Sequence, residues 1–556
     1  MPRRRCVRQD VGRGQQRRPD PVRRNAEAAA HRAVARRRDD VGRVENALQN
    51  SSPGRRSRAL RRVDPHRVAG ALMTWTSTTA LMAHQIDAVA KLIPTRIGAL
   101  FADLGTGKSR ILLELARLRQ LKFNYLVWFC PVSAMENTRR EILKHTDIPA
   151  DMIYVFGPKT NVETIPLDRC VYIVGIESMQ SSNRIFRAVD KLITEQSYVA
   201  VDESTYIKGA FSRRTKRITG LSERARYRCV MTGTPLTQGA VDLYAQMRFL
   251  SPKILGYQSF GAFGANHLEY RMVRMPGRRN LVRTDHVVRA HNVEYLAARI
   301  APYTYQIRAE ECLDLPGAIH ETRWFAMTKA QRRLYEQVKE QILREEEENM
   351  MNPMNSIWIF RLFSALQAVI CGYHGISKQE MVRVEHDRVE NMLAVISEIP
   401  EDERIVVWSK YLPAAADIKA ALENRYGAGC VATFTGPTAN TRESELAEWK
   451  DGKRRFLVAT QQSGSHAQTW IEAAFVIFYA DGFKFSEREQ AEKRTMRFGQ
   501  TRKVRYVTLR CSDSIDEKIG SAIGGKRDTL REFKRQVDVY RAQGLKAKIV
   551  EAIKSL

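Results

Sequence analysis

Apolar residues in this chain gather in short continuous runs, and each run is followed by a stretch in which apolar residues recur every three or four positions. Continuous apolar runs predict strands buried on both faces of a sheet, and the wider spacing predicts helices. Strands that alternate with helices favour a parallel, doubly wound sheet with ligands at the carboxyl ends of the strands. One set of runs lies before residue 250 and another after residue 403, so the pattern predicts an α/β protein with two such lobes.

A glycine-rich turn follows the run that ends at Ala102, and its sequence is Ala102-Asp-Leu-Gly-Thr-Gly-Lys-Ser109. Between a strand and a helix, such a turn binds phosphate, because backbone N–H groups at the start of the helix point at the anion. We expect Lys108 to reach the β- and γ-phosphates and Ser109 to ligate Mg²⁺. The strict pattern begins with glycine rather than Ala102, which leaves a fortuitous glycine-rich turn as the alternative. The predicted nucleotide-binding residues of this turn are Gly105, Thr106, Gly107, Lys108 and Ser109.

Two carboxylates end a later apolar run, Tyr198-Val-Ala-Val-Asp-Glu203. We expect Asp202 to hold Mg²⁺, directly or through water. Glu203 is expected to polarise the attacking water, since positioning and charge supply most of the catalysis in phosphoryl transfer. In isolation the pair fits a solvated acidic strand end, but downstream of a phosphate loop it indicates an ATP hydrolase.

The second set of strands leads to the sequence Gln490-Ala-Glu-Lys-Arg-Thr-Met-Arg497. Offsets of three and four place Gln490, Arg494 and Arg497 near one face of a helix. Arginine stays charged and forks onto phosphate oxygens, so the two arginines are expected to reach the γ-phosphate when the lobes close. An exposed amphipathic basic helix is the alternative.

With these elements in this order, the chain resembles the superfamily-two helicases, and more closely the Snf-type DNA translocases that power chromatin remodellers and their bacterial and phage relatives. The resemblance covers about residues 80–520. Beyond the phosphate loop and the arginines, it rests on Leu81-Met-Ala-His-Gln85-Ile-Asp-Ala-Val, Pro131-Val-Ser-Ala-Met-Glu-Asn137, Asp202-Glu-Ser-Thr-Tyr-Ile-Lys208, Thr232-Gly-Thr-Pro-Leu236, Ala301-Pro-Tyr-Thr-Tyr-Gln-Ile-Arg308, Asp314-Leu-Pro316 and Met327-Thr-Lys-Ala-Gln-Arg-Arg-Leu-Tyr335.

The resemblance implies two RecA-like lobes with helical insertions between them, ATP and Mg²⁺ as cofactors, and double-stranded DNA as the partner. It assigns Gln85 to the adenine and places Gln490 among the nucleotide-binding residues. It makes Arg497 the arginine finger and Arg494 its partner. The catalytic residues that it implies are Lys108, Glu203, Arg494 and Arg497, and the metal ligands are Ser109 and Asp202.

Two other segments carry roles only through the resemblance. In the family, the segment that matches 131–137 touches the tracking strand, and the one that matches 232–236 couples hydrolysis to DNA contact. This chain departs from the family at residues 463–468, where Ser-Gly-Ser-His-Ala-Gln replaces a Gly-Gly-x-Gly-Leu-Asn run. Gly464 is retained and Gln468 is a candidate replacement for the asparagine, so coupling between ATP and DNA is where this protein is expected to differ most.

Charge along the 556 residues is uneven, and it sums to a formal +29. Residues 1–72 contain 20 arginines, no lysine and 7 acidic residues, hence +13, which leaves +16 for the rest. A basic body favours a polyanionic partner. The lysine-free composition of the first 72 residues is typical of a high-GC sequence read outside its frame, so we expect a disordered tail and a biological start at or near Met73. A basic nucleic-acid-binding arm is the second interpretation, and a transit peptide, which the acidic residues disfavour, is the third.

The expected domains follow from these boundaries. A first lobe occupies 73–250, helical protrusions and an inter-lobe linker 251–385, a second lobe 386–515, and basic helices 516–556. The arginines in 271–283 lie either on a DNA-facing helical protrusion or on a solvated loop. The eight cysteines form no Cys-x-x-Cys pair, and the chain shows neither a long apolar run nor a signal-peptide pattern. We therefore expect a reduced, cytoplasmic protein without membrane contact. We also expect a monomer, and a single ATPase engine without accessory modules suits a bacterium or a phage-infected host cell.

The sequence thus predicts an ATP hydrolase that moves along duplex DNA. A strand-separating DNA or RNA helicase is the nearest alternative, and a wedge hairpin would favour it. An ATP-gated nucleic-acid clamp with little turnover is the alternative from another class of protein.

Overall fold

The computed structural model describes residues 74–233, 239–274, 281–347, 349–351, 357–375, 381–438, 440–461, 468–525 and 528–556. Residues 72–556 form one compact unit. Three predictions lie outside the described residues: the Arg-rich segment with its start at Met73, the Thr-Pro-Leu part of the 232–236 motif, and residues 463–467 of the altered run.

Seven parallel strands form the sheet of the first lobe, which we call lobe 1, in the order β3-β4-β2-β5-β6-β1-β9. Their buried apolar residues are the continuous runs that the sequence shows, and they form one core with the helices on both faces. The three strands β5, β6 and β1 are neighbours, so their carboxyl ends meet at one edge of the sheet. The strands are β1 Ile97–Ala102, β2 Tyr125–Cys130, β3 Ile153–Val155, β4 Val171–Gly175, β5 Ser197–Val201, β6 Tyr227–Thr232 and β9 Thr304–Ile307.

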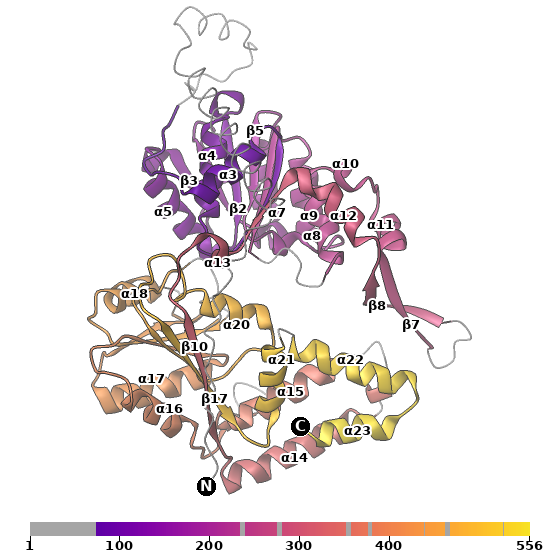
Figure 1. Cartoon of the computed structure of the whole chain (residues 1–556), viewed down its shortest axis with the longest axis vertical. Helices are drawn as coiled ribbons and strands as arrows, with labels where there is room; N and C mark the ends of the chain where they lie inside the picture. The colour runs from indigo at the N-terminus through magenta and orange to yellow at the C-terminus, as the bar shows by residue number, and fades with distance from the viewer. Residues whose placement is uncertain are drawn as a thin grey trace, which may run out of the picture. The chain divides into compact units, whose positions relative to one another are not determined.

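Six parallel strands form the sheet of lobe 2, in the order β10-β17-β16-β13-β15-β14. Apolar clusters cover its two faces, which matches strands that are hydrophobic throughout. Strand β10 lies alongside β17 at the sheet edge (Figure 1). The strands are β10 Ala318–Phe325, β13 Ile405–Ser409, β14 Val431–Phe434, β15 Phe456–Thr460, β16 Phe475–Phe478 and β17 Val504–Cys511. The predicted α/β class with two parallel sheets is confirmed.

The segment expected to link the lobes contributes a strand to each sheet, β9 to lobe 1 and β10 to lobe 2. Helices flank the sheets and fill the remaining segments (Figure 1). Those up to residue 250 are α3 Ala83–Leu92, α4 Lys108–Arg117, α5 Met135–His145, α6 Ser178–Ser181, α7 Asn183–Leu192, α8 Arg213–Ser222 and α9 Val241–Leu250. The later ones are α10 Pro252–Leu255, α11 Phe260–His267, α12 Val293–Ile300, α13 Ala309–Cys312, α14 Lys329–Glu345, α15 Ile357–Ile370, α16 Arg388–Ser397, α17 Leu412–Tyr426, α18 Arg442–Lys450, α20 Phe485–Glu492, α21 Ile515–Gly524, α22 Thr529–Ala542 and α23 Lys546–Lys554. None of the helices that the structure describes combines the length and the apolar character needed to span a membrane.

Two antiparallel strands occupy the region where we expected either a DNA-facing helical protrusion or a solvated loop. The strands of this hairpin are β7 Leu268–Arg274 and β8 Leu281–Ala290, and they reach beyond α11 (Figure 1). The β-branched and aromatic residues in this stretch favour extended backbone, which is why the helical expectation was wrong. The ring of the buried His267 at the root of the hairpin contacts the Tyr257 hydroxyl at 2.9 Å and stacks on the ring of Tyr295. Packed aromatic rings therefore surround the residue that precedes the hairpin.

Candidate active site

Glycines shape the phosphate loop between β1 and α4. Gly105 and Gly107 have φ angles of 88° and 80°, a left-handed conformation that a side chain disfavours. Gly107 is the N-cap of α4, so the helix starts at Lys108 and its first N–H groups point toward the loop. The Thr106 hydroxyl donates to the Asp103 carbonyl at 2.8 Å and closes the turn. The structure therefore forms the anion-binding loop that the sequence predicts.

Lys108 lies inside this loop, with its ammonium beneath the turn. Its Nζ donates to the carbonyl oxygens of Ala102 at 2.9 Å and Asp103 at 3.2 Å. Burial lowers the pKa of Lys108, while the nearby charges of Glu203 and Asp202 act to raise it. An anion bound in the loop would therefore stabilise the charged form of the buried Lys108.

Gln85 supports the loop from helix α3. Its Nε2 donates to the Thr106 carbonyl at 3.1 Å, and its Oε1 accepts from the Met82 backbone N–H at 3.0 Å. The neighbouring His84 ring also bonds the Thr106 carbonyl, at 2.8 Å, which sequence reasoning missed. A Cβ at Gly107 would lie 2.2 Å from Gln85 Nε2, so a side chain there would displace Gln85, and the φ of 80° also favours glycine. In this conformation Gln85 holds the turn rather than lining the cavity beside it.

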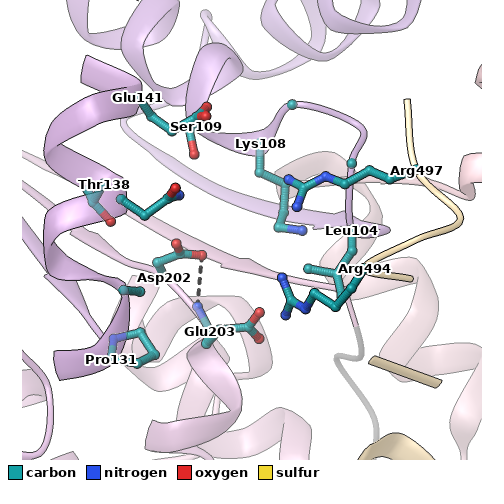
Figure 2. A pocket seen from close by; sticks show the side chains of 14 residues that line it. Leu104, Lys108, Ser109, Pro131, Thr138, Glu141, Asp202, Glu203, Arg494 and Arg497 are labelled. Atoms are coloured by element: carbon teal, nitrogen blue, oxygen red, sulfur yellow. Dashed lines mark hydrogen bonds between the residues drawn. The ribbon is translucent and has the colours of Figure 1, made fainter. Parts of the chain in front are cut away.

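The two carboxylates follow β5 and lie next to the phosphate loop. Glu203 has a φ of 48°, a left-handed conformation that costs a non-glycine residue about 1–2 kcal/mol. This turn gives the two side chains different directions, and the Glu203 N–H donates to Asp202 Oδ1 at 2.9 Å (Figure 2). From the end of β6, the buried Thr232 hydroxyl donates to Glu203 Oε2 at 3.4 Å. Strand ends that are adjacent in the sheet therefore bring the loop, the two carboxylates and Thr232 together.

Burial and the neighbouring Glu203 charge raise the pKa of Asp202 to about 7, against the opposing charge of Lys108. A divalent cation beside the carboxylate would favour its ionised form. Ser109 lines the same cavity as Asp202. Mg²⁺ is typically held by one or two carboxylates together with substrate phosphates. This donor set fits Mg²⁺, and the described ranges contain no cluster of three or more His, Cys, Asp or Glu side chains that would suggest an all-protein metal site.

Arg494 and Arg497 enter the site from lobe 2. Their Nη1 atoms donate to one acceptor, the Gln468 carbonyl, at 2.9 Å and 3.4 Å. Burial, followed by the charge of Arg497, lowers the pKa of Arg494 to about 9, and burial also lowers the pKa of Arg497. Arg497 crosses the phosphate loop so closely that a Cβ at Gly105 would lie 2.8 Å from its Cγ. Figure 2 shows the two guanidinium groups directed toward Glu203 and Lys108.

The predicted helical face of the arginine segment is wrong. Helix α20 ends at Glu492, so Arg494 and Arg497 lie in the turns beyond it. The backbone carbonyl of Arg494 accepts instead from the Trp470 N–H at 2.8 Å, which ties the turn to the segment just after the altered run rather than to a continuing helix. Because the offsets of three and four no longer align the side chains, Gln490 does not line the cavity with the two arginines. Gln468 contributes its carbonyl, and its side-chain Nε2 faces Glu443 at 3.5 Å.

The cavity between these groups has a volume of about 70 Å³. It is lined from lobe 1 by the phosphate loop, the two carboxylates and helix α5, and from lobe 2 by the two arginines (Figure 2). Pockets for small ligands are usually about 300–1,000 Å³. The cavity is therefore too small to enclose a whole nucleotide, and its lining fits the phosphate end of one. Pro131 and Asn137 of the segment expected to touch DNA also line this cavity.

Two further residues that sequence reasoning missed join the lobes beside the cavity. Lys493 Nζ lies 3.1 Å from Asp103 Oδ1. The other oxygen of Asp103 accepts from the Ala309 N–H at 3.1 Å. Asp103 occupies a variable position of the phosphate-loop pattern, so the pattern does not predict the contact between Asp103 and Lys493.

Comparison with known proteins places the chain in a family. A model of the SNF2-related domain matches residues 43–372, which is more than half of the chain and begins inside the Arg-rich segment. An uncharacterized ATP-dependent helicase of Mycoplasma pneumoniae is 20% identical over 359 residues, covering 63% of this chain and 32% of that protein. Protein CHROMATIN REMODELING 24 of Arabidopsis thaliana is 23% identical over 396 residues, covering 63% of this chain and 35% of that protein.

The chain thus spans about a third of the length of these two curated relatives. Among solved structures, the Sulfolobus solfataricus SWI2/SNF2 ATPase core in complex with dsDNA is 18% identical, with 84% of this chain and 98% of that chain covered and a TM-score of 0.38. Because the family model matches more than half of its residues, the protein belongs to the SNF2-related domain family.

Proposed function

We propose that the protein hydrolyses ATP in a reaction that duplex DNA stimulates, and that it uses the cycle to move along the duplex. One observation carries the proposal: a single cavity receives a phosphate loop, a Glu203 carboxylate turned by a left-handed backbone, and two arginines from the other lobe. The family and the relatives that are named as ATP-dependent helicases support the use of ATP.

Each group has a role that its position supports. Lys108 and the loop N–H groups bind the phosphates, while Ser109 and Asp202 would hold Mg²⁺, which neutralises phosphate charge. Glu203 orients the attacking water and accepts its proton, a role suited to a carboxylate beside the phosphate loop. The two arginines stabilise the charge that develops on the γ-phosphate. Adenine recognition by Gln85 and nucleotide contact by Gln490 stay predictions.

The division of the site between two lobes supports control by DNA. Arg494 and Arg497 reach the phosphate loop only from lobe 2, so hydrolysis depends on how the lobes are arranged. A duplex that contacts both lobes through its phosphates would favour one arrangement over others without reading sequence. We therefore expect DNA to raise turnover more than it raises ATP affinity.

The test compares ATP hydrolysis by the wild type and Glu203→Gln, each with and without linear duplex DNA. We expect duplex to raise the wild-type rate and Glu203→Gln to bind ATP but hydrolyse it at a small fraction of that rate. Displacement of a third strand from a linear duplex then distinguishes movement from simple stimulation. A wild-type rate that duplex leaves unchanged would contradict the proposal, and it is the result that a nucleic-acid clamp with little turnover would give.

A second candidate function, strand separation, gains support from the β7–β8 hairpin. Between residues 268 and 290 the sequence has six arginines against two acidic residues, and the hairpin follows the packed aromatic rings around His267. A basic hairpin is a suitable element to insert between the two strands at a fork. Unwinding of a forked duplex by the wild type, lost on changing the exposed Arg283 and Arg289 to alanine, would favour this function. Third-strand displacement without unwinding would exclude it.

A further inference from the structure

The Asp103 carboxylate joins three parts of the chain at the edge of the candidate site. Its Oδ1 accepts from Lys493 Nζ at 3.1 Å, and its Oδ2 accepts from the Ala309 N–H at 3.1 Å. Its own backbone N–H donates to the Ile307 carbonyl at 3.2 Å. One residue of the phosphate loop is thereby bonded to the segment after β9 and to lobe 2.

Lys493 is placed to transmit this contact to the arginines. It directly precedes Arg494, in the turn that follows helix α20. The carbonyl of Asp103 accepts from Lys108 Nζ at 3.2 Å, so the other end of the contact is part of the loop itself. A shift of the Lys493 backbone away from Asp103 would therefore carry Arg494 with it, because the two residues are adjacent in the chain.

The pair is partly shielded from solvent, with 22% of the Lys493 side chain and 19% of the Asp103 side chain exposed. Burial acts to lower the pKa of Lys493, but the charges of Glu489 and Asp103 raise it above its ordinary value. Lys493 is accordingly a full cation at neutral pH. A second ion pair between the lobes, Arg140 with Glu443 at 3.3 Å, is more exposed, at 54% and 38%, and lies outside the cavity lining. Arg140 serves as the control, and Glu443 is left unchanged because it also contacts Gln468 Nε2.

We propose that the Asp103–Lys493 pair positions Arg494 and Arg497 over the phosphate loop and so sets how often the hydrolysing arrangement of the lobes forms. This inference rests on the proposed function for its effect on turnover. Asp103 and Lys493 are positioning residues, since they act on the phosphates through the loop and through the arginines. Lys493 Nζ also lies 3.0 Å from Glu489 Oε1 of the preceding helix α20, so a purely local role for Lys493 is the competing explanation.

The kinetic test uses Lys493→Gln, Asp103→Asn, the double variant, and the controls Arg140→Gln and Glu489→Gln. We expect Lys493→Gln to lower kcat about tenfold, or about 1.4 kcal/mol, while the affinity for ATP changes by less than about twofold. Lys493→Gln, Asp103→Asn and the double variant all remove the same contact between Asp103 and Lys493. The double variant should therefore be no slower than the slower single variant. Lys493→Arg should restore most of the rate because it keeps the charge.

A second measurement needs no hydrolysis. Hydrogen exchange at residues 103–107 should become about tenfold faster in Lys493→Gln, because Arg497 then covers the loop less often, and should stay unchanged in Arg140→Gln. Equal effects of Lys493→Gln and Arg140→Gln on kcat and on exchange would overturn the proposal, as would additive losses in the double variant. Equal effects of Glu489→Gln and Asp103→Asn would instead assign Lys493 the local role. A wild type without DNA-stimulated hydrolysis refutes the proposed function, whereas the exchange experiment still tests the pair.

Discussion

Replacement of Gly105 by alanine is expected to stop hydrolysis by displacing Arg497. Gly105 has a φ of 88°, and a Cβ there would lie 2.8 Å from Arg497 Cγ, closer than two such atoms approach in proteins. Because Cγ is near the root of the side chain, a rotation of the guanidinium alone does not relieve the overlap. The whole Arg497 side chain must leave the loop, or the loop must deform.

Two effects of different size follow from this substitution. Alanine in a left-handed conformation costs about 1–2 kcal/mol of folding stability. Loss of an arginine finger costs about 10³–10⁵ in turnover, or roughly 4–7 kcal/mol of transition-state stabilisation. The first effect appears in unfolding and the second in the rate of the chemical step, so the two are measured separately.

Gly256→Ala is the matched control, because Gly256 has a φ of 79° and a Cβ there would meet no atom within 4 Å. Urea unfolding should show similar destabilisation for both variants, while single-turnover hydrolysis at saturating ATP should be slow only in Gly105→Ala. Adding Gly105→Ala to Arg497→Ala should cost little further rate, since the displaced group is already absent. Turnover of Gly105→Ala within about threefold of Gly256→Ala would refute the assigned position of Arg497.

Three other variants test separate parts of the structure. Arg388→Ala leaves the buried Asp516, 3.0 Å from the Arg388 guanidinium, without its ion-pair partner, so urea unfolding should show lobe 2 destabilised by about 3–5 kcal/mol, and an unchanged midpoint would contradict this. Burial lowers the pKa of Lys410 from 10.5 to about 6. Between pH 6 and pH 10.5 Lys410 is therefore protonated in the unfolded chain but neutral in the folded protein, so the free energy of unfolding rises with pH in this range. Lys410→Met should stabilise the protein at pH 7 and flatten that rise, as urea titrations at several pH values would show. Asp202→Asn should raise the Mg²⁺ concentration needed for half-maximal hydrolysis, and an unchanged requirement would remove Asp202 from the metal site.

Much of lobe 1 could be predicted because its chemistry lies at the ends of continuous apolar runs. A strand buried on both faces is apolar throughout, so the end of the apolar run marks the end of the strand. In the structure, strands end close to these positions, at Ala102, Val201 and Thr232. Neighbouring parallel strands then bring those ends to one edge of the sheet. The phosphate loop and the two carboxylates are local motifs, and their spatial proximity follows from this topology.

The lobe 2 side of the site could be predicted only in part, because its geometry depends on contacts between distant segments. Arg494 and Arg497 were found by residue type, but the end of α20 at Glu492 depends on Trp470 and on the Gln468 carbonyl, which helical spacing does not reveal. The same holds for Lys493, whose partner is 390 residues earlier in the chain. Tertiary contacts decide such positions against local propensity.

The charges in the cavity explain how ATP binding and the arrangement of the lobes are linked. Burial lowers the pKa of Lys108, Arg494 and Arg497 and raises that of Asp202, so each group is held at a cost in its charged form. A triphosphate with its divalent cation carries the charges that would reverse all four shifts, because the phosphates favour the three cations and the metal ion favours the carboxylate. Two of those cations come from lobe 2 and the other two groups from lobe 1. Binding of ATP to lobe 1 would recover part of this free energy, and the arginines of lobe 2 would recover the rest only when the lobes take the hydrolysing arrangement, which ties turnover to the arrangement of the lobes.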